Sequence, residues 1–260
     1  MARALSRASA QFTEHYLDLG APGAVTAVAR QITEVGLVTT DGLTSREAVL
    51  AAAGLIMEVT AHRDSDPDGL TVIRDTRHHQ HRAGFAGLGR DELAVHTESS
   101  GVPDPPRLML LACLQPAPEG GECLLVDGRA VYGHLSQHCP EAALRLGLPR
   151  TAYFGAGDGH ATQVFTRHAD ERVSVRLRQD SLARFNPTIQ PHLPQLRAAV
   201  AVTQHAMALD VGQGYLIDNH RWLHARRRFT GERLCLRALG HARFPLPVGF
   251  LPHTSVDRGR

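Results

Sequence analysis

Short apolar runs interrupted by Gly, Pro and Asp constrain the fold of this chain most strongly. They lie at residues 70–73, 108–114, 123–126, 173–177, 214–217 and 234–239. Runs of this length, bounded by turn-forming residues, are typical of β-strands. Their spacing is too irregular for a parallel sheet in which a helix follows each strand. We therefore expect a closed or sandwiched antiparallel sheet with helices packed outside it.

Helical patterns occupy the first third of the chain and two later segments. Apolar residues three or four positions apart, the spacing of one helix face, predict helices in segments 8–19, 25–35 and 44–59. The third of these begins with Ser45 and Glu47, which form a helix-start pattern. Two further helices are expected at 129–145 and 194–209, the second with Met207 on its apolar face.

No segment of the chain has the composition of a linker between domains. Its 260 residues are enough for one large domain with a sizeable hydrophobic core. We therefore expect a single domain over residues 1–260, with a helical N-terminal part at about 1–65 and a core at about 66–245.

The chain contains no lysine, because all 28 of its Lys-plus-Arg residues are arginine. P-loop nucleotide hydrolases, protein kinases and enzymes that form Schiff bases each need a lysine, so these classes are excluded. The net charge of +2 is far less basic than that of dedicated nucleic-acid-binding proteins. No apolar run approaches the ~20 residues that span a membrane. We expect neither a nucleic-acid partner nor a membrane.

Cysteine usage and the N-terminal residues indicate the compartment. Neither a CxxC pair nor zinc-finger spacing occurs among the four cysteines, which are Cys113, Cys123, Cys139 and Cys235. The arginines near the N-terminus are not followed by the apolar segment of a signal peptide. Free thiols without a secretory signal predict a cytoplasmic protein.

Sixteen histidines are spread along the chain, so a single histidine carries little information. The cluster of His78, His79 and His81 could bind a metal, but Arg77 and Arg82 flank it and their charges oppose a cation. A polar, solvated loop is the favoured interpretation of this segment.

A second pattern, His96 and Glu98, places two metal-ligand side chains at positions i and i+2. Because side chains alternate along a strand, both would point to the same side of it. His224 follows the apolar run at 214–217 and a turn, which would return the chain with this side chain pointing inward. Two histidines and one carboxylate on one side of a metal are typical of non-haem Fe(II) oxygenases. The same ligands also serve zinc hydrolases, although the HExxH motif common in those is absent.

Two arginines, Arg233 and Arg237, lie four residues apart, and Leu234 and Leu236 lie between them. On a strand they would share one face, and two guanidinium groups in one pocket suit bidentate binding of carboxylates. The alternative is a solvated arginine stripe on an edge strand. Just before them, the arginines at 226–228 could form a basic surface for nucleic acid. A loop with one buried and two solvated arginines is the favoured interpretation of that run.

Taken together, the motifs between residues 96 and 237 resemble the taurine dioxygenase and clavaminate synthase family. The resemblance rests on His96-x-Glu98, Gly120-Gly121-Glu122-Cys123, Asp218-Asn219-His220-Arg221-x-x-His224-x-Arg226 and Arg233-x-x-x-Arg237. It implies a mainly β fold with flanking helices, organised as a double-stranded β-helix, which is a cupin-like jelly roll. It also implies a dioxygenase that uses Fe(II), 2-oxoglutarate and O₂ and releases succinate and CO₂.

The resemblance assigns roles residue by residue. His96, Glu98 and His224 match the iron ligands of the family. Arg233 matches the arginine that binds the C5 carboxylate of 2-oxoglutarate. Arg237 matches a position that contacts an anionic group of the substrate in some relatives. Cys123 stands where the family usually has a threonine that donates to the same C5 carboxylate.

Glutamate at position 98, where aspartate is commoner, resembles the clavaminate synthase branch of the family. That branch includes amino-acid hydroxylases of peptide-antibiotic pathways. We therefore expect an amino acid or amino-acid-derived substrate of specialised metabolism, with hydroxylation, desaturation and cyclisation all open. A free or carrier-bound substrate and the oligomeric state also stay open. The alternative functions are a metal-dependent hydrolase with the same three ligands and a non-enzymatic basic binding protein.

Overall fold

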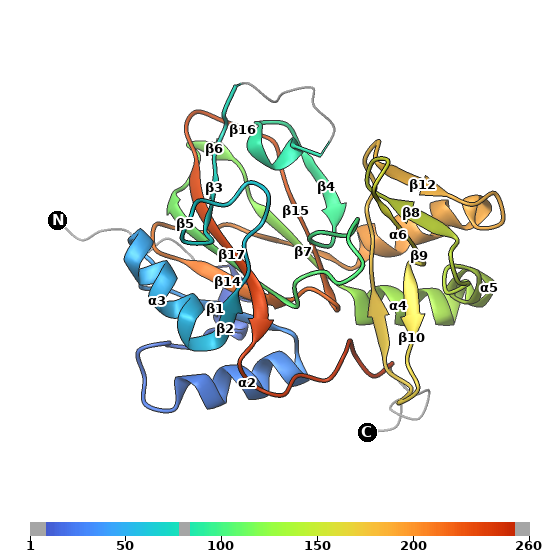
Figure 1. Cartoon of the computed structure of the whole chain (residues 1–260), viewed down its shortest axis with the longest axis horizontal. Coiled ribbons are helices and arrows are strands. Elements are labelled where there is room, and N and C mark those ends of the chain that lie inside the picture. Colours follow the sequence, from blue (N-terminus) through green and yellow to red (C-terminus); the bar gives the residue numbers. More distant parts are fainter. Residues whose placement is uncertain (1–8, 78–83, 253–260) are drawn as a thin grey trace.

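The computed structural model describes residues 9–77 and 84–252 and shows a mainly β protein with flanking helices (Figure 1). Its larger sheet has the order β1 (Leu37–Thr40), β14 (Gly214–Asp218), β5 (Leu108–Gln115), β17 (Leu234–Ala242) and β2 (Met57–Val59), and β3 (Thr71–Ile73) also pairs with β17. Its smaller sheet has the order β13 (Gln204–Met207), β7 (Cys123–Asp127), β15 (Trp222–Arg226) and β4 (Leu93–His96). Every pairing in both sheets is antiparallel, as the sequence predicts.

The two sheets share a hydrophobic cluster. Met109, Cys113 and Tyr215 reach this cluster from the larger sheet, and Leu125 and Trp222 reach it from the smaller one. All five side chains are almost completely buried. Removal of such apolar surface from water is the main contribution to the stability of a fold of this kind.

Along β17, side chains alternate between two environments. Cys235 and Leu239 belong to the cluster shared by the two sheets. Leu236 and Ala238 instead pack with the helices α2 (Ala24–Glu34) and α3 (Arg46–Ile56), which cover the outer face of the larger sheet (Figure 1). By the same period of two, Arg237 lies on the side of β17 that faces the smaller sheet.

Helices also cover the outer face of the smaller sheet. Leu124, Val126, Leu223 and Ala225, from β7 and β15, pack against apolar side chains of α4 (Gly128–His138), α5 (Pro140–Arg145) and α6 (Leu193–Val202). Short strands between α5 and α6 lie on the same side of the molecule: β8 (Ala152–Phe154), β9 (His160–Thr162), β10 (Phe165–Arg167), β11 (Val173–Val175) and β12 (Ala183–Phe185) (Figure 1). The remaining elements are α1 (Ala10–Glu14), the paired strands β6 (Glu119–Gly120) and β16 (Phe229–Thr230), and the 3₁₀-helices η1 (Ala86–Leu88) and η2 (Gln190–His192).

The helix predictions for the N-terminal part hold only in part. Ser45 Oγ accepts a hydrogen bond from the backbone N–H of Ala48, which confirms the predicted start of α3. The predicted helix at 8–19 is limited to the five residues of α1. Met57–Val59, predicted as the end of a helix, forms β2, because pairing with β17 outweighs the local helical pattern.

The two later helices are shorter than the sequence predicts. Pro140 has no N–H and keeps Cys139 out of the helical conformation, so the segment 129–145 divides into α4 and α5. The helix α6 ends at Val202. Met207 therefore does not lie on a helix face but belongs to β13 and packs in the cluster shared by the sheets.

Three further features of the sequence can be compared with the structure: the histidine cluster, the lack of a membrane-spanning segment and the cysteines. The histidine cluster at 78–81 falls outside the described residues. Within the described ranges, no helix is both long enough and apolar enough to cross a membrane. All four cysteines are free thiols, and three of them are buried.

Candidate metal centre

Two neighbouring strands of the smaller sheet carry the two histidines that the sequence singles out as metal ligands. His96 is the last residue of β4, and His224 is the middle residue of β15. The two residues are direct partners in the antiparallel ladder, and their ring centroids lie 4.3 Å apart. Strand pairing therefore brings together imidazoles that are far apart in the sequence.

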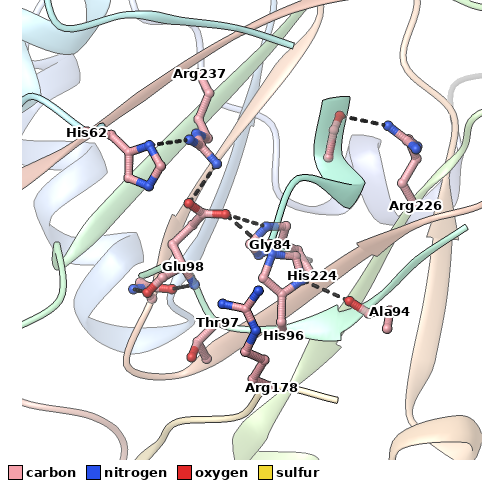
Figure 2. A network of polar contacts seen from close by, with 12 residues as sticks. His62, Gly84, Ala94, His96, Thr97, Glu98, Arg178, His224, Arg226 and Arg237 are labelled. Carbon is pink, nitrogen blue, oxygen red and sulfur yellow. Dashed lines mark hydrogen bonds and ion pairs between the residues drawn. The ribbon is translucent and has the colours of Figure 1, made fainter. Parts of the chain in front are cut away.

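Glu98 completes a cluster with these two histidines (Figure 2). Its Oε1 lies 3.4 Å from Nε2 of His96 and 3.3 Å from Nε2 of His224. The three ligand atoms all lie within 4.8 Å of one another, and no other such group of His, Cys, Asp or Glu occurs in the described part of the chain. Two imidazoles and one carboxylate are a donor set that fits Fe(II) and also Zn²⁺.

The ring of His96 is oriented by the backbone. Its Nδ1 lies 2.8 Å from the carbonyl oxygen of Ala94, as Figure 2 shows. Because a carbonyl only accepts, Nδ1 is the donor in this contact, and Nε2 is the ring nitrogen that faces Glu98. A hydrogen bond of this kind fixes the tautomer that a metal requires.

Burial and charge set the protonation of the cluster. Burial alone would raise the pKa of Glu98, but Arg237 and the two histidines outweigh it and hold the pKa well below its usual range. Burial, together with the neighbouring His96, lowers the pKa of His224 to about 4. At neutral pH the carboxylate is therefore ionised and His224 is neutral, which are the forms that bind a metal.

Arg237 connects the two sheets at this cluster. It projects from β17, and its Nη1 donates a hydrogen bond of 2.7 Å to Oε2 of Glu98, which leaves Oε1 to face the imidazoles (Figure 2). Its Nη2 lies 3.4 Å from Nδ1 of His62 and 3.5 Å from Oγ1 of Thr71. Nothing in the sequence marks His62, because one histidine among sixteen carries little information.

Arg233 lies just before β17 and is 6% exposed. Its Nη2 lies 3.8 Å from Sγ of Cys123, the first residue of β7. The Cys113 and Cys235 thiols and the Tyr215 phenol also act on its charge, and its guanidinium carbon lies 6.0 Å from the centroid of the Phe229 ring. No carboxylate of the described residues forms an ion pair with it. An ionised group that is buried without an opposite charge is costly, so this guanidinium marks a place for an anion.

Cys123 places a neutral thiol beside Arg233. Burial raises the pKa of this thiol to about 11, although Arg233 acts in the opposite direction. The thiol therefore supplies no negative charge to the guanidinium at neutral pH.

The consecutive arginines at 226–228 divide as the sequence predicts. Arg226 is 4% exposed, whereas the next two arginines are exposed. The guanidinium of Arg226 donates to the backbone carbonyl oxygens of Gly87, Gly89 and Asp91. It therefore holds the segment that leads into β4, and the run of three does not act as one basic surface.

Fold and site together define a class of protein, in which two antiparallel sheets position two histidines and a carboxylate for one metal ion. The family model described as "Taurine catabolism dioxygenase TauD, TfdA family" matches residues 6–239. The chain belongs to this family, which the motif resemblance predicts.

Solved structures share the fold. Asparagine oxygenase in complex with Fe(II), 2S,3S-3-hydroxyasparagine and succinate is 16% identical with a TM-score of 0.69, over 83% of this chain and 77% of that one. The non-heme iron oxygenase OrfP in complex with Fe and alpha-ketoglutaric acid is 17% identical with a TM-score of 0.66, over 84% of this chain and 80% of that one. At these identities the similarity concerns the fold alone.

Proposed function

We propose that this protein is an Fe(II)- and 2-oxoglutarate-dependent dioxygenase that oxidises an amino acid or an amino-acid-derived metabolite. The observation that carries the proposal is the cluster of His96, Glu98 and His224, together with the buried, unpaired guanidinium of Arg233. The solved structures of asparagine oxygenase and OrfP support it, because they contain iron, succinate and a hydroxylated amino acid. The oxidation is a hydroxylation, a desaturation or a cyclisation.

In this proposal His96, Glu98 and His224 would hold the iron, because they form the donor set that non-haem Fe(II) oxygenases use. When bound, the metal would supply the O₂-dependent oxidation that converts 2-oxoglutarate to succinate and CO₂. The chain prepares the ligands in advance. Arg237 keeps Glu98 ionised and burial keeps His224 neutral, so both residues accept a metal without releasing a proton.

Arg233 binds the C5 carboxylate of 2-oxoglutarate in this proposal. Its planar guanidinium can hold two carboxylate oxygens side by side. An anion at this place would also remove the cost of burying an unpaired cation. Cys123, which contacts Arg233, offers only a weak donor, so Arg233 supplies most of the binding energy for this carboxylate.

Arg237 has N–H donors that are not fully used within the protein and that could bind an anionic group of the substrate. Its Nη1 is taken by Glu98, but the contacts of Nη2 are long. Its buried Nε has no hydrogen-bond partner among the described residues. We therefore keep Arg237 as the candidate for substrate binding, alongside its contact with the proposed iron ligand.

Two ion pairs near the metal centre suit a substrate that carries both signs of charge. Nε of Arg178 and Oδ1 of Asp180 lie 2.5 Å apart, and Nε of Arg63 and Oδ2 of Asp64 lie 3.1 Å apart. The Asp64 carboxylate also lies 3.6 Å from Nδ1 of His62, which contacts Arg237. Gln179, between Arg178 and Asp180, donates a hydrogen bond of 3.2 Å to the carbonyl of Val95, next to His96, so the pair lies close to the metal ligands. Figure 2 shows Arg178 on the same side of the cluster as His96. An amino acid carries an ammonium and a carboxylate, and these pairs could exchange partners with both.

For the fold we propose a double-stranded β-helix, a cupin-like jelly roll whose two walls are the larger and smaller sheets. The connection from β14 to β15 supports it, because the turn at 219–221 carries the chain from one sheet to the other. We propose one domain, with an N-terminal part at about 1–65 and a core at about 66–245. Free thiols and the small net charge support a cytoplasmic enzyme with a small-molecule partner.

An anaerobic titration tests the proposed function. Addition of Fe(II) and then 2-oxoglutarate should produce a weak visible charge-transfer band, which a hydrolase or a binding protein would not give. A scan of amino acids and their derivatives for O₂-dependent succinate release would then identify the substrate. Tight zinc binding without the band, and without succinate release, would instead favour the metal-dependent hydrolase.

A further inference from the structure

Glu98 lies beyond the end of the strand that was expected to present it. The strand β4 stops at His96, and Glu98 begins a turn in which Ser99 has a φ of 50°. The period of two along a strand therefore does not by itself place Glu98 beside His96. The backbone N–H and C=O of Glu98 need other partners, because a buried backbone group is rarely left unpaired.

The side chain of Asn219 supplies these partners. Its Oδ1 accepts a hydrogen bond of 2.7 Å from the backbone N–H of Glu98. Its Nδ2 donates a hydrogen bond of 3.1 Å to the backbone carbonyl of the same residue. Facing residues of two antiparallel strands exchange this same pair of bonds. The Asn219 side chain thus takes the place of the facing residue in a neighbouring strand.

Asn219 is itself firmly held. It is 1% exposed and lies in the turn between β14 and β15. Its backbone N–H donates a hydrogen bond of 2.8 Å to the carbonyl of Arg107, and its Nδ2 donates a second bond, also of 2.8 Å, to the carbonyl of Pro106. The strand that follows this turn carries His224. One turn therefore fixes the backbone of Glu98 and leads directly into the strand of His224.

We propose that Asn219 is a positioning residue of the metal centre, whose amide holds the backbone of Glu98 so that Oε1 faces the two imidazoles. The inference rests on the proposed metal-binding function and adds a residue that does not contact the metal. A shift of the Glu98 backbone would carry its carboxylate with it. Residues that orient metal ligands typically change metal affinity by about 10- to 100-fold when they are replaced.

The chemistry of the amide explains why asparagine stands here. An aspartate of the same shape would still accept from the N–H of Glu98. Its second oxygen, however, would face the carbonyl oxygens of Glu98 and Pro106 with no proton to donate. An alanine would remove the side-chain partner of all three backbone groups. Asn219→Asp therefore removes two of the three contacts, and Asn219→Ala removes all three.

Metal affinity of the whole protein distinguishes this role from a structural one. Calorimetric titration with Co(II), an air-stable substitute for Fe(II), would compare wild type with Asn219→Asp and Asn219→Ala. The melting temperature of each metal-free protein would be measured in parallel. We expect the affinity of Asn219→Asp to fall by about tenfold or more, and that of Asn219→Ala to fall further.

A variant of the adjacent residue provides the matched control. Asp218 is also buried in this segment, where its carboxylate pairs with Arg107 at 2.7 Å. Asp218→Asn keeps the shape and removes the charge, so it should lower the melting temperature at least as much as Asn219→Asp. Its Co(II) affinity should nevertheless stay within about threefold of wild type, because the contacts to Glu98 are intact.

Equal Co(II) affinity in wild type and Asn219→Asp would overturn the inference. An equally large loss in Asp218→Asn would overturn it too, because the effect would then belong to the turn as a whole. If Asn219→Ala does not fold, the isosteric Asn219→Asp decides alone. Absence of Co(II) binding by the wild type would overturn the proposed metal-binding function itself, so the two failures are distinguishable.

Discussion

Two buried charges at the site, Glu98 and Arg233, are 5% and 6% exposed but differ in their partners. Glu98 contacts one guanidinium and two imidazoles. Arg233 contacts a thiol and forms no ion pair with any described carboxylate. A buried ionised group is stable only with compensation. The surroundings of Glu98 thus suit a cation held with the imidazoles, and the surroundings of Arg233 suit an anionic ligand.

Replacement of Arg233 by alanine should weaken the binding of 2-oxoglutarate by about 2–5 kcal/mol, because one partner of a buried charged pair is removed. Arg233→Lys should rescue binding poorly, since an ammonium cannot reproduce a bidentate contact. Arg237→Ala should act mainly on the substrate, and also on metal affinity through Glu98. Anaerobic titration of 2-oxoglutarate into the metal-loaded protein measures the effects of the two Arg233 substitutions, whereas the substrate KM and a metal titration measure those of Arg237→Ala. Unchanged binding in Arg233→Ala would refute the assignment.

The pKa of His220 gives a prediction about acid stability. Burial lowers this pKa to about 4, although Asp218 acts in the opposite direction, and neither ring nitrogen has a partner in the described part of the chain. This folded-state pKa lies below the unfolded value of 6.5, so the unfolded chain takes up a proton at a higher pH than the folded chain does. The associated free energy of unfolding is therefore fully present above pH 6.5 and decreases as the pH falls toward 4. Between pH 7 and pH 5 the resulting loss in the free energy of unfolding is on the order of 2 kcal/mol.

His220→Leu should remove this loss, because leucine does not titrate. Urea unfolding of wild type and variant at pH 7 and pH 5 would test it. His224 titrates in both proteins, so the difference between them isolates His220. The same loss of stability in both proteins would show that His220 does not contribute.

At the scale of elements, the sequence predicted the strands that carry long apolar runs. The strands β5, β7, β14 and β17 were found because each is buried along most of its length. Strands β8, β9, β10 and β12 have three residues each and were not predicted. The equally short β3 and β11 were predicted, because they lie in the longer strand-like segments 70–73 and 173–177. The segment at 204–207 was assigned to a helix because its partner, β7, is distant in the sequence.

The last residue of β15 helps to hold the segment that contains η1. Arg226 donates to three backbone carbonyls of residues 87–91, just before β4 and His96. Arg226→Met should therefore lower the free energy of unfolding by about 2–3 kcal/mol, because these buried or partly buried carbonyls lose their donors. It should also speed amide hydrogen exchange at 86–92. The matched control is Arg227→Met, whose exposed side chain should leave both quantities unchanged. Equal effects of the two substitutions would contradict this role of Arg226.

At the scale of the whole molecule, the site lies between the two sheets. The smaller sheet carries His96 and His224, whereas Arg237 belongs to the larger sheet and Arg233 immediately precedes its strand β17. The sequence predicted these residues, because their spacing forms recognisable motifs. It did not predict that Arg237 pairs with Glu98 or that Asn219 holds its backbone. Both contacts join segments more than 100 residues apart, and only the packed sheets bring them together.

The proposed function requires that His96, Glu98 and His224 together bind one Fe(II). Anaerobic Fe(II) titration of His96→Ala, Glu98→Ala and His224→Ala, with the exposed His241→Ala as the control, tests this most directly. Each of the three variants should stay folded, bind Fe(II) at least about tenfold more weakly than wild type, and lose succinate release. The control should bind one equivalent as wild type does. Wild-type Fe(II) affinity in Glu98→Ala, with the chain folded and no ligand added, would contradict the account.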